Sequence, residues 1–276
     1  MVSSATIVIK PSRGWSFPDF REIWEFRELL FFFAWRDIKV RYKQTVLGAA
    51  WAVIQPFFTM IVFTIFFGRF AQIPSEGLPY PIFSYAALVP WTYFANNISQ
   101  ISASMVTQRG IMTKVYFPRL LIPLASIISG LVDFSIAFTV LLAMMFYYGI
   151  IPTAIVIFVP LFTLFSIVAA LGAGLWLSTM NVMYRDVGYA MPFLVQFWLF
   201  ATPIAYPASL VPPRWRAIYG INPMTGVIEG FRWSLLGAGE GLDPLGVAVS
   251  VLIVIVMLIT GLLYFERNER RFADIV

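Results

Sequence analysis

Six long apolar stretches, separated by short polar segments, dominate this chain of 276 residues. A membrane-spanning helix needs about 17–25 mostly apolar residues, and each of these stretches is long enough. The pattern therefore predicts an all-α polytopic membrane protein with six transmembrane helices inside residues 46–265. The predicted spans are 46–68, 80–106, 120–148, 152–180, 189–206 and 245–265.

Residues 1–45 come before the first apolar stretch and carry charges throughout, so they do not have the apolar core of a signal peptide. Between Pro18 and Tyr42 the apolar residues recur near helical spacing. They are Phe20, Ile23, Trp24, Phe31, Trp35 and Ile38. We expect an amphipathic interface helix lying on the cytoplasmic surface, either as a simple anchor or as a docking surface for a cytoplasmic partner.

The segment 207–244 is too apolar for a solvated loop and too interrupted for a seventh span. Because proline cannot continue a helix, the Asn222-Pro223 step predicts two short helices that meet there. We expect them to re-enter the outer leaflet or the protein, where they would pack against the spans or cap a pore. The candidate gate residues in this external segment are Trp215, Tyr219, Glu229 and Phe231.

Composition leaves little room for a soluble protein, because 60% of the residues are hydrophobic, only 12% are charged, and the mean hydropathy is +0.82. The basic residues also favour one side of the predicted membrane. Fifteen of the 19 lie in residues 1–45, in the segments after the second and fourth spans, or in the tail 266–276; the other four are Arg69, Arg214, Arg216 and Arg232. The positive-inside tendency therefore places both termini in the cytoplasm, in a multi-pass topology.

The residues that most catalytic sites need are absent. The sequence has no histidine, no cysteine and no Gly-Lys-Ser or Gly-Lys-Thr phosphate loop. These absences exclude histidine-based proton relays, the usual zinc sites, serine triads and a phosphate-loop ATPase within this sequence. We predict no catalytic, cofactor-binding or metal-binding residue, and we expect the energy for any transport to come from elsewhere.

Asp133 is the one acidic residue inside a predicted span, next to Ser129, Gly130 and Ser135. A carboxylate within a membrane is costly and marks a functional candidate. The same spans offer it no basic partner, so a hydrogen-bonded or protonated structural residue at a helix interface is an equal interpretation.

Polar and aromatic side chains gather in the first, second and fifth predicted spans. Asn96, Asn97 and Gln100 follow an aromatic cluster, and such a polar run should face other helices or a hydrated path. Aromatic rings can stack on sugars, although they also fill helix interfaces and membrane belts. The candidate residues for a substrate path are Trp51, Phe57, Trp91, Tyr93, Phe94, Asn97, Phe197, Trp198 and Tyr206.

Several short motifs then occur in a characteristic order. Residues 36–48, with Trp51 and Pro56, resemble the entry to the first span of type-2 ABC exporter permeases that move polysaccharides. The further matches are Pro90-Trp91 with Phe94 and Asn96, Asn181-Val182 with Tyr184-Arg185-Asp186, Thr202-Pro203-Ile204 with Tyr206, and Asn222-Pro223-Met224. Together they cover nearly the whole chain, which resembles the membrane subunits of O-antigen, capsule and teichoic-acid exporters.

This resemblance implies a permease that works as a homodimer in the bacterial inner membrane with two separate ABC ATPase subunits, which use the ATP and Mg²⁺. It also implies that the N-terminal helix and the loop after the second span contact those ATPases. The candidate coupling residues are Arg36, Lys39, Arg41, Arg109, Lys114, Tyr116 and Arg119. Without the resemblance, the basic residues of the loop are equally explained as topogenic charges or lipid-headgroup contacts.

The sequence leaves three other functions open. A type-2 ABC exporter of drugs or small lipids would have the same architecture. A proton-coupled secondary transporter would need Asp133 to titrate. A membrane-embedded glycosyltransferase would need a nucleotide-sugar site, and the external acids Glu76, Glu229, Glu240 and Asp243 form no recognisable motif of that kind.

Overall fold

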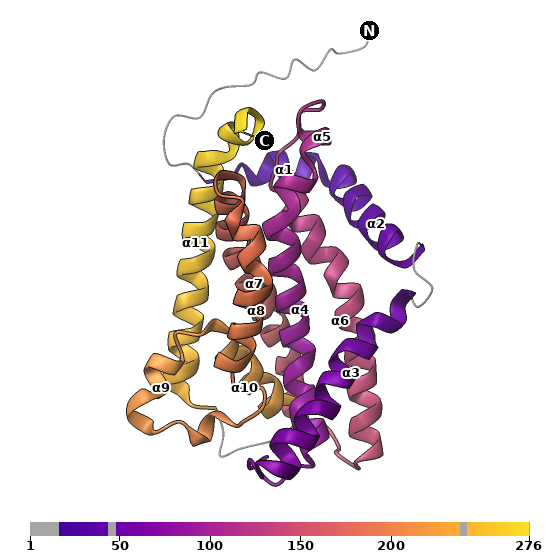
Figure 1. Ribbon diagram of the computed structural model, residues 1–276, viewed down its shortest axis with the longest axis vertical. Helices are drawn as coiled ribbons and strands as arrows, with labels where there is room; N and C mark the ends of the chain where they lie inside the picture. Colours follow the sequence, from indigo (N-terminus) through magenta and orange to yellow (C-terminus); the bar gives the residue numbers. More distant parts are fainter. Residues whose placement is uncertain (1–16, 44–47, 238–241, 276) are drawn as a thin grey trace.

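A computed structural model describes residues 17–43, 48–237 and 242–275, and these residues form helices joined by turns, without a β-strand among them (Figure 1). The elements are α1 (Phe20–Glu25), α2 (Arg27–Lys43), η1 (Gly48–Ala50), α3 (Trp51–Phe63), η2 (Thr64–Phe70), α4 (Tyr80–Thr107), α5 (Arg109–Met112), α6 (Leu121–Tyr147), η3 (Ala154–Phe158), α7 (Val159–Met183), α8 (Asp186–Ala201), η4 (Ala208–Leu210), α9 (Pro213–Tyr219), α10 (Pro223–Leu236) and α11 (Pro244–Ile275).

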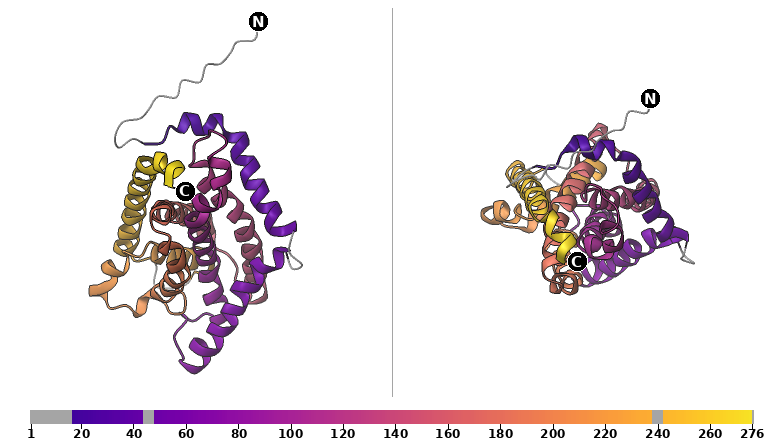
Figure 2. Two further views of the ribbon diagram at one scale, coloured as in Figure 1. Left: turned by 45° about the horizontal axis from the view of Figure 1, so that its top comes forward. Right: turned by 90° about the horizontal axis from the view of Figure 1, so that it is seen from above.

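Helix α4 is the central element of the bundle. It packs against α3, α6, α7 and α10, and most of its residues are buried (Figure 1). α7 also packs along α11, so the bundle runs from α11 on one side to α2 on the other (Figure 2). Burial inside the bundle explains how α4 carries a polar row without exposing it to lipid.

Four segments of the described chain are long and apolar enough to cross a membrane: Gly48–Phe70, Leu121–Tyr147, Ala154–Met183 and Pro244–Glu269. They correspond to the first, third, fourth and sixth predicted spans. Helix α4 has 28 residues, but the polar residues of its second half lower its hydropathy. Helix α8, which overlaps the fifth predicted span, has only 16 residues. Length and apolarity alone therefore support four of the six predicted spans.

The N-terminal segment differs from the single surface helix that the sequence predicts. Asp19 caps the short helix α1, the chain turns at Phe26, and α2 then runs beside α6 towards the start of α3 (Figure 1). Phe33 and Ala34 are buried in this packing, whereas Phe31 and Trp35 remain exposed. The periodicity identified the helix, but contacts with α6 decided how it lies.

The opposite end of the bundle carries the two short helices that the sequence predicts in segment 207–244 (Figure 1). Helix α9 ends at Tyr219, and the Asn222 side chain accepts a hydrogen bond of 3.1 Å from the backbone N–H of Met224 at the start of α10. Pro223 takes the first position of α10, where its missing N–H costs nothing. Helix α10 is buried against α4, α7 and α11.

Candidate functional site

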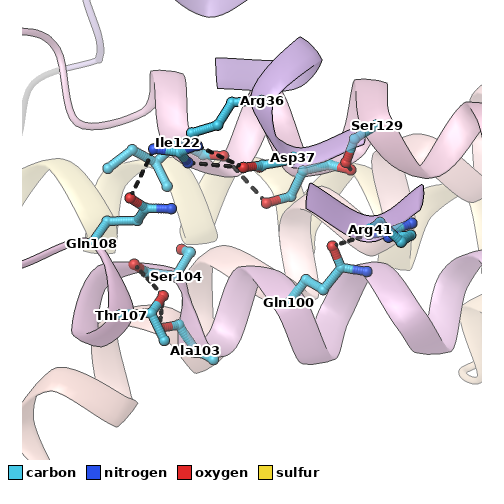
Figure 3. A network of polar contacts seen from close by, with 11 residues as sticks. Arg36, Asp37, Arg41, Gln100, Ala103, Ser104, Thr107, Gln108, Ile122 and Ser129 are labelled. Carbon is cyan, nitrogen blue, oxygen red and sulfur yellow. Dashed lines mark hydrogen bonds and ion pairs between the residues drawn. The ribbon is translucent and has the colours of Figure 1, made fainter. Parts of the chain in front are cut away.

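Asp133 lies in a polar cluster between α2, α4 and α6. Its carboxylate forms an ion pair with Arg41 and accepts a hydrogen bond from the Tyr42 hydroxyl. The Arg41 guanidinium also donates to the side-chain oxygen of Gln100 at 2.6 Å (Figure 3). Burial and the neighbouring carboxylate raise the pKa of Tyr42, so this hydroxyl keeps its proton. The basic partner missing from the predicted spans thus comes from the helix that precedes them.

A cavity of about 220 Å³ adjoins this cluster. It brings together three predicted path residues, Trp51 from α3 with Tyr93 and Asn97 from α4. The remaining lining is Arg41, Tyr42, Gly48, Ala52, Gln55, Val89, Thr92, Asn96, Gln100, Gly130, Asp133, Phe134 and Ala137. Amide, hydroxyl, aromatic and paired charged groups therefore meet in one space within the helix bundle.

The other predicted path residues do not join this cavity. Trp91 and Phe94 are buried on α4, and the Phe94 ring meets that of Trp198 edge-on at 4.9 Å. Phe57 and Phe197 are exposed on α3 and α8. The Tyr206 hydroxyl lies 2.6 Å from that of Tyr219. A single copy of the chain therefore divides these residues between its interior and its surface.

A second, strongly apolar cavity of about 710 Å³ lies between α8, α9 and α11. Phe197 and Trp198 line it together with two predicted gate residues, Trp215 and Tyr219. The Trp198 indole N–H donates to the Asn222 side-chain oxygen at 2.9 Å, which ties α8 to the break between α9 and α10. Residues predicted for the substrate path and residues predicted for the gate thus line the same cavity.

Most of the predicted coupling residues lie on α2 and in segment 109–119, whereas Arg41, near the last turn of α2, lies beside Asp133 inside the bundle. Lys39, Arg109 and Lys114 are exposed, whereas Arg36 and Arg41 turn inward. The Arg36 guanidinium donates to the Gln108 side chain at 3.1 Å and pairs with the adjacent Asp37 (Figure 3). Two arginines of α2 therefore reach Gln100 in α4 and Gln108 directly after its end.

The loop after α5 is joined to the N-terminal helices and to α11. The Tyr116 hydroxyl donates to the Glu22 carboxylate at 3.1 Å, and the backbone N–H of Arg119 donates to the Glu269 carboxylate at 3.1 Å. The rings of Phe33 and Phe117 meet edge-on at 5.4 Å. The two segments expected to contact a partner therefore form one continuous surface.

Arg232 was counted in the sequence only as an external charge, but it is buried at the end of the bundle that carries α9 and α10. Its guanidinium donates to the carbonyl oxygens of Pro203 and Ile204, both at 2.7 Å, and of Phe83 at 3.2 Å. It also stacks over the Phe83 ring at 3.5 Å. Only its position near Glu229 on the same helix hinted at this role.

Glu229 borders a cavity of about 620 Å³ that is lined by residues of η4, α9, α10 and the start of α11. Burial raises its pKa from 4.5 to about 7, with smaller contributions from Glu76 and Asp243, while Arg232 and Arg216 oppose the rise. The predicted gate residue Phe231 is fully buried against Phe134. Glu229 therefore faces the cavity, whereas Phe231 packs in the core.

Comparison with known proteins gives a consistent result. The model of the family described as "ABC-2 type transporter" matches residues 28–236. The chain is 26% identical over 258 residues to the O-antigen export system permease protein RfbA of Myxococcus xanthus, covering 92% of this chain and 97% of that protein. It is 28% identical over 244 residues to the protein of the same name from Klebsiella pneumoniae, covering 87% and 92%. It is also 22% identical over 241 residues to the polysialic acid transport protein KpsM of Escherichia coli, covering 85% and 91%.

Proposed function

Since the chain belongs to the ABC-2 type transporter family, we propose that it is the permease subunit of an ATP-driven exporter that moves a polysaccharide, or a lipid-linked polysaccharide such as O-antigen or capsule. The observation that carries this proposal is similarity to O-antigen export permeases along nearly the whole chain. In a bacterium making lipopolysaccharide, such a permease would serve its biosynthesis by delivering the O-antigen across the inner membrane.

The chain is an integral inner-membrane protein, and its proposed topology has six spans with both termini cytoplasmic. Helix α4 would be the second span, shielded by its neighbours, and α8 would form most of the fifth. The arrangement of the helices supports this proposal, because α1, α5 and the end of α11 lie at one end of the bundle while α9 and α10 lie at the other (Figure 1).

The proposed motor is an ABC ATPase in a separate chain, present in two copies beside a permease homodimer. ATP and Mg²⁺ would act in that partner, and the permease would need no cofactor. Exposed Lys39, Arg109 and Lys114 would contact it, because they share the surface built by α2 and the loop after α5. Arg36 and Arg41 would pass movement of α2 to α4 and α6 through their inward contacts.

In this mechanism, movement of the α2 surface separates the two permease copies along a central path, and the polymer passes between them. A path with weak contacts at many sites suits passage of a polymer better than a path with one tight binding site. Phe57 and Phe197 are exposed on single copies and are available to line such a path. Helices α9 and α10 would close it at rest. Replacing Trp215 and Tyr219 by alanine should then increase ion leak through the reconstituted permease, and an unchanged leak would argue against the gate.

The deciding experiment measures surface polysaccharide and ATPase activity in cells that express the permease with its partner ATPase. The controls are cells without the partner and cells with a partner whose phosphate-loop lysine is replaced. We expect export only with the active ATPase. Transport that survives the inactive partner but stops when the proton gradient is collapsed would replace this proposal with a proton-coupled transporter.

A further inference from the structure

The cavity beside Asp133 has walls from four parts of the chain. They are the end of α2, the start of α3, and the middles of α4 and α6. Because α3 and α6 lie in apolar segments able to cross a membrane, these polar walls stand within the helix bundle. Polar groups inside a membrane-spanning bundle cost free energy unless they are paired, bind a ligand or line a hydrated path.

One buried polar atom in this cavity wall is left without a partner. Asn97 has no exposed surface, and its amide nitrogen donates to the Tyr93 carbonyl at 2.8 Å. Its side-chain oxygen, however, accepts no hydrogen bond in the structure. Gly130 lets α6 approach this amide, since a Cβ there would lie 2.5 Å from the Asn97 nitrogen. Among the described residues this oxygen is thus a buried acceptor without a donor, and a hydrogen bond to it would be favourable.

The charges of the cavity do not favour an ion. Arg41 and Asp133 neutralise each other, and the other polar lining groups, including Gln55, Thr92 and Asn96, are amides and hydroxyls. Hydroxyl groups both donate and accept hydrogen bonds, so a neutral, hydroxyl-rich ligand matches these walls better than a phosphate does. Trp51 and Tyr93 add aromatic surface, which packs against the apolar face of a sugar ring.

We propose that this cavity binds one sugar ring, presented either by the headgroup of a glycolipid or by a free glycan. Its volume of about 220 Å³ is smaller than the roughly 300–1,000 Å³ of ordinary ligand sites, so it accepts a single ring and not a length of polymer. The inference rests on the proposed export of a polysaccharide and names a recognition site for its sugar inside each permease copy.

The chain contains no cysteine, so single introduced cysteines report on the cavity without background. Ala52→Cys and Ala137→Cys place a thiol in its wall, and Phe146→Cys places one on the exposed surface as a control. The full-length variants are placed in lipid nanodiscs without ATPase and treated with a small polar thiol reagent, and the rate of labelling is measured. The nanodiscs contain monoglucosyl diacylglycerol, the same amount of diacylglycerol, or diacylglycerol with free glucose in the buffer.

We expect monoglucosyl diacylglycerol to slow labelling at both cavity positions by about tenfold at roughly ten times its Kd, and to leave Phe146→Cys unchanged. Protection by free glucose as well would assign recognition to the ring from either source; protection by the glycolipid alone would assign it to the headgroup. Asn97→Leu, which keeps the approximate volume but removes the amide, should abolish protection in protein that remains monodisperse.

Equal labelling in all three samples, or equal protection by diacylglycerol without sugar, would overturn the proposal. Protection that survives in both Asn97→Leu and Gln55→Ala would also contradict it, because the ligand would then not use these amides. The assay includes neither ATPase nor transport. A permease that exports polysaccharide but shows no protection would therefore disprove this site and leave the proposed function standing.

Discussion

Arg41 at the end of α2 and Asp133 in the middle of α6 form an ion pair between residues that are 92 positions apart in the chain. The Tyr42 hydroxyl donates a hydrogen bond to the Asp133 carboxylate, and the Gln100 side-chain oxygen accepts one from Arg41. The pair joins the helix proposed to contact the ATPase to the wall of a polar cavity inside the bundle. Any displacement of the end of α2 must therefore move this wall or break the pair.

The first prediction concerns the strength of this pair. Asp133→Asn and Arg41→Gln should each destabilise the permease by about 1–3 kcal/mol, because each leaves a partly buried charge without its partner. The double variant should lose less than the sum of the two losses. Thermal unfolding in nanodiscs measures all three. Strictly additive losses would show that the two side chains do not depend on each other.

The second prediction concerns the role of Arg232 at the end of the bundle that carries α9 and α10. Arg232→Met leaves the carbonyls of Phe83, Pro203 and Ile204 without their donor, and should cost roughly 1–3 kcal/mol for each group that water cannot reach. Arg232→Lys should recover only part of this lost stability, since one ammonium group cannot replace the several N–H donors of the guanidinium. An Ile204→Cys reporter, buried in the parent, should label faster in Arg232→Met; unchanged labelling would show that Arg232 does not hold this turn.

The third prediction tests the close approach of α7 and α11. A Cβ added at Gly261 would lie 2.7 Å from the carbonyl oxygen of Gly172, and one at Gly172 would lie 2.8 Å from the backbone nitrogen of Leu258. Backbone atoms cannot move aside, so either Gly→Ala change should destabilise the protein by about 1–3 kcal/mol. Gly110→Ala is the control, because a Cβ there meets nothing within 4 Å. Equal melting temperatures for all three variants would contradict this packing.

The fourth prediction concerns pH. The buried Glu229 has its pKa raised from 4.5 to about 7, so the folded state holds this proton more tightly than the unfolded state does. Stability from Glu229 should therefore fall as the pH rises from about 4.5 to about 7, by roughly 1–3 kcal/mol, and then level off. Glu229→Gln should remove this part of the pH dependence in thermal unfolding curves. An identical slope in the variant would assign the dependence to other groups.

The fifth prediction tests the docking surface. The double variant Arg109→Glu and Lys114→Glu reverses two exposed charges, and should reduce co-purification of the partner ATPase by roughly tenfold, which corresponds to about 1.4 kcal/mol. Arg214→Glu reverses an exposed charge on α9 at the opposite end, and should leave co-purification unchanged. Equal retention of the ATPase by both variants would place the docking surface elsewhere.

Much of the fold is predictable from the sequence because apolar runs and turn residues act locally. The long apolar stretches gave four helices of spanning length, and the Asn222-Pro223 step gave the separation of α9 and α10. The motif order indicated the family that the comparison then showed. Each apolar stretch, turn and single motif lies within a few tens of neighbouring residues.

The polar contacts were decided by tertiary structure. Sequence analysis found Asp133 but no partner for it, because Arg41 comes from a helix outside the apolar stretches and reaches it through the path of α2 along α6. The sequence identified Arg232 only as an external charge. In the folded chain, three carbonyl oxygens surround its guanidinium. Hydrophobic patterning sets which segments are helices, whereas these side-chain contacts across 28 to 149 positions depend on how those helices pack.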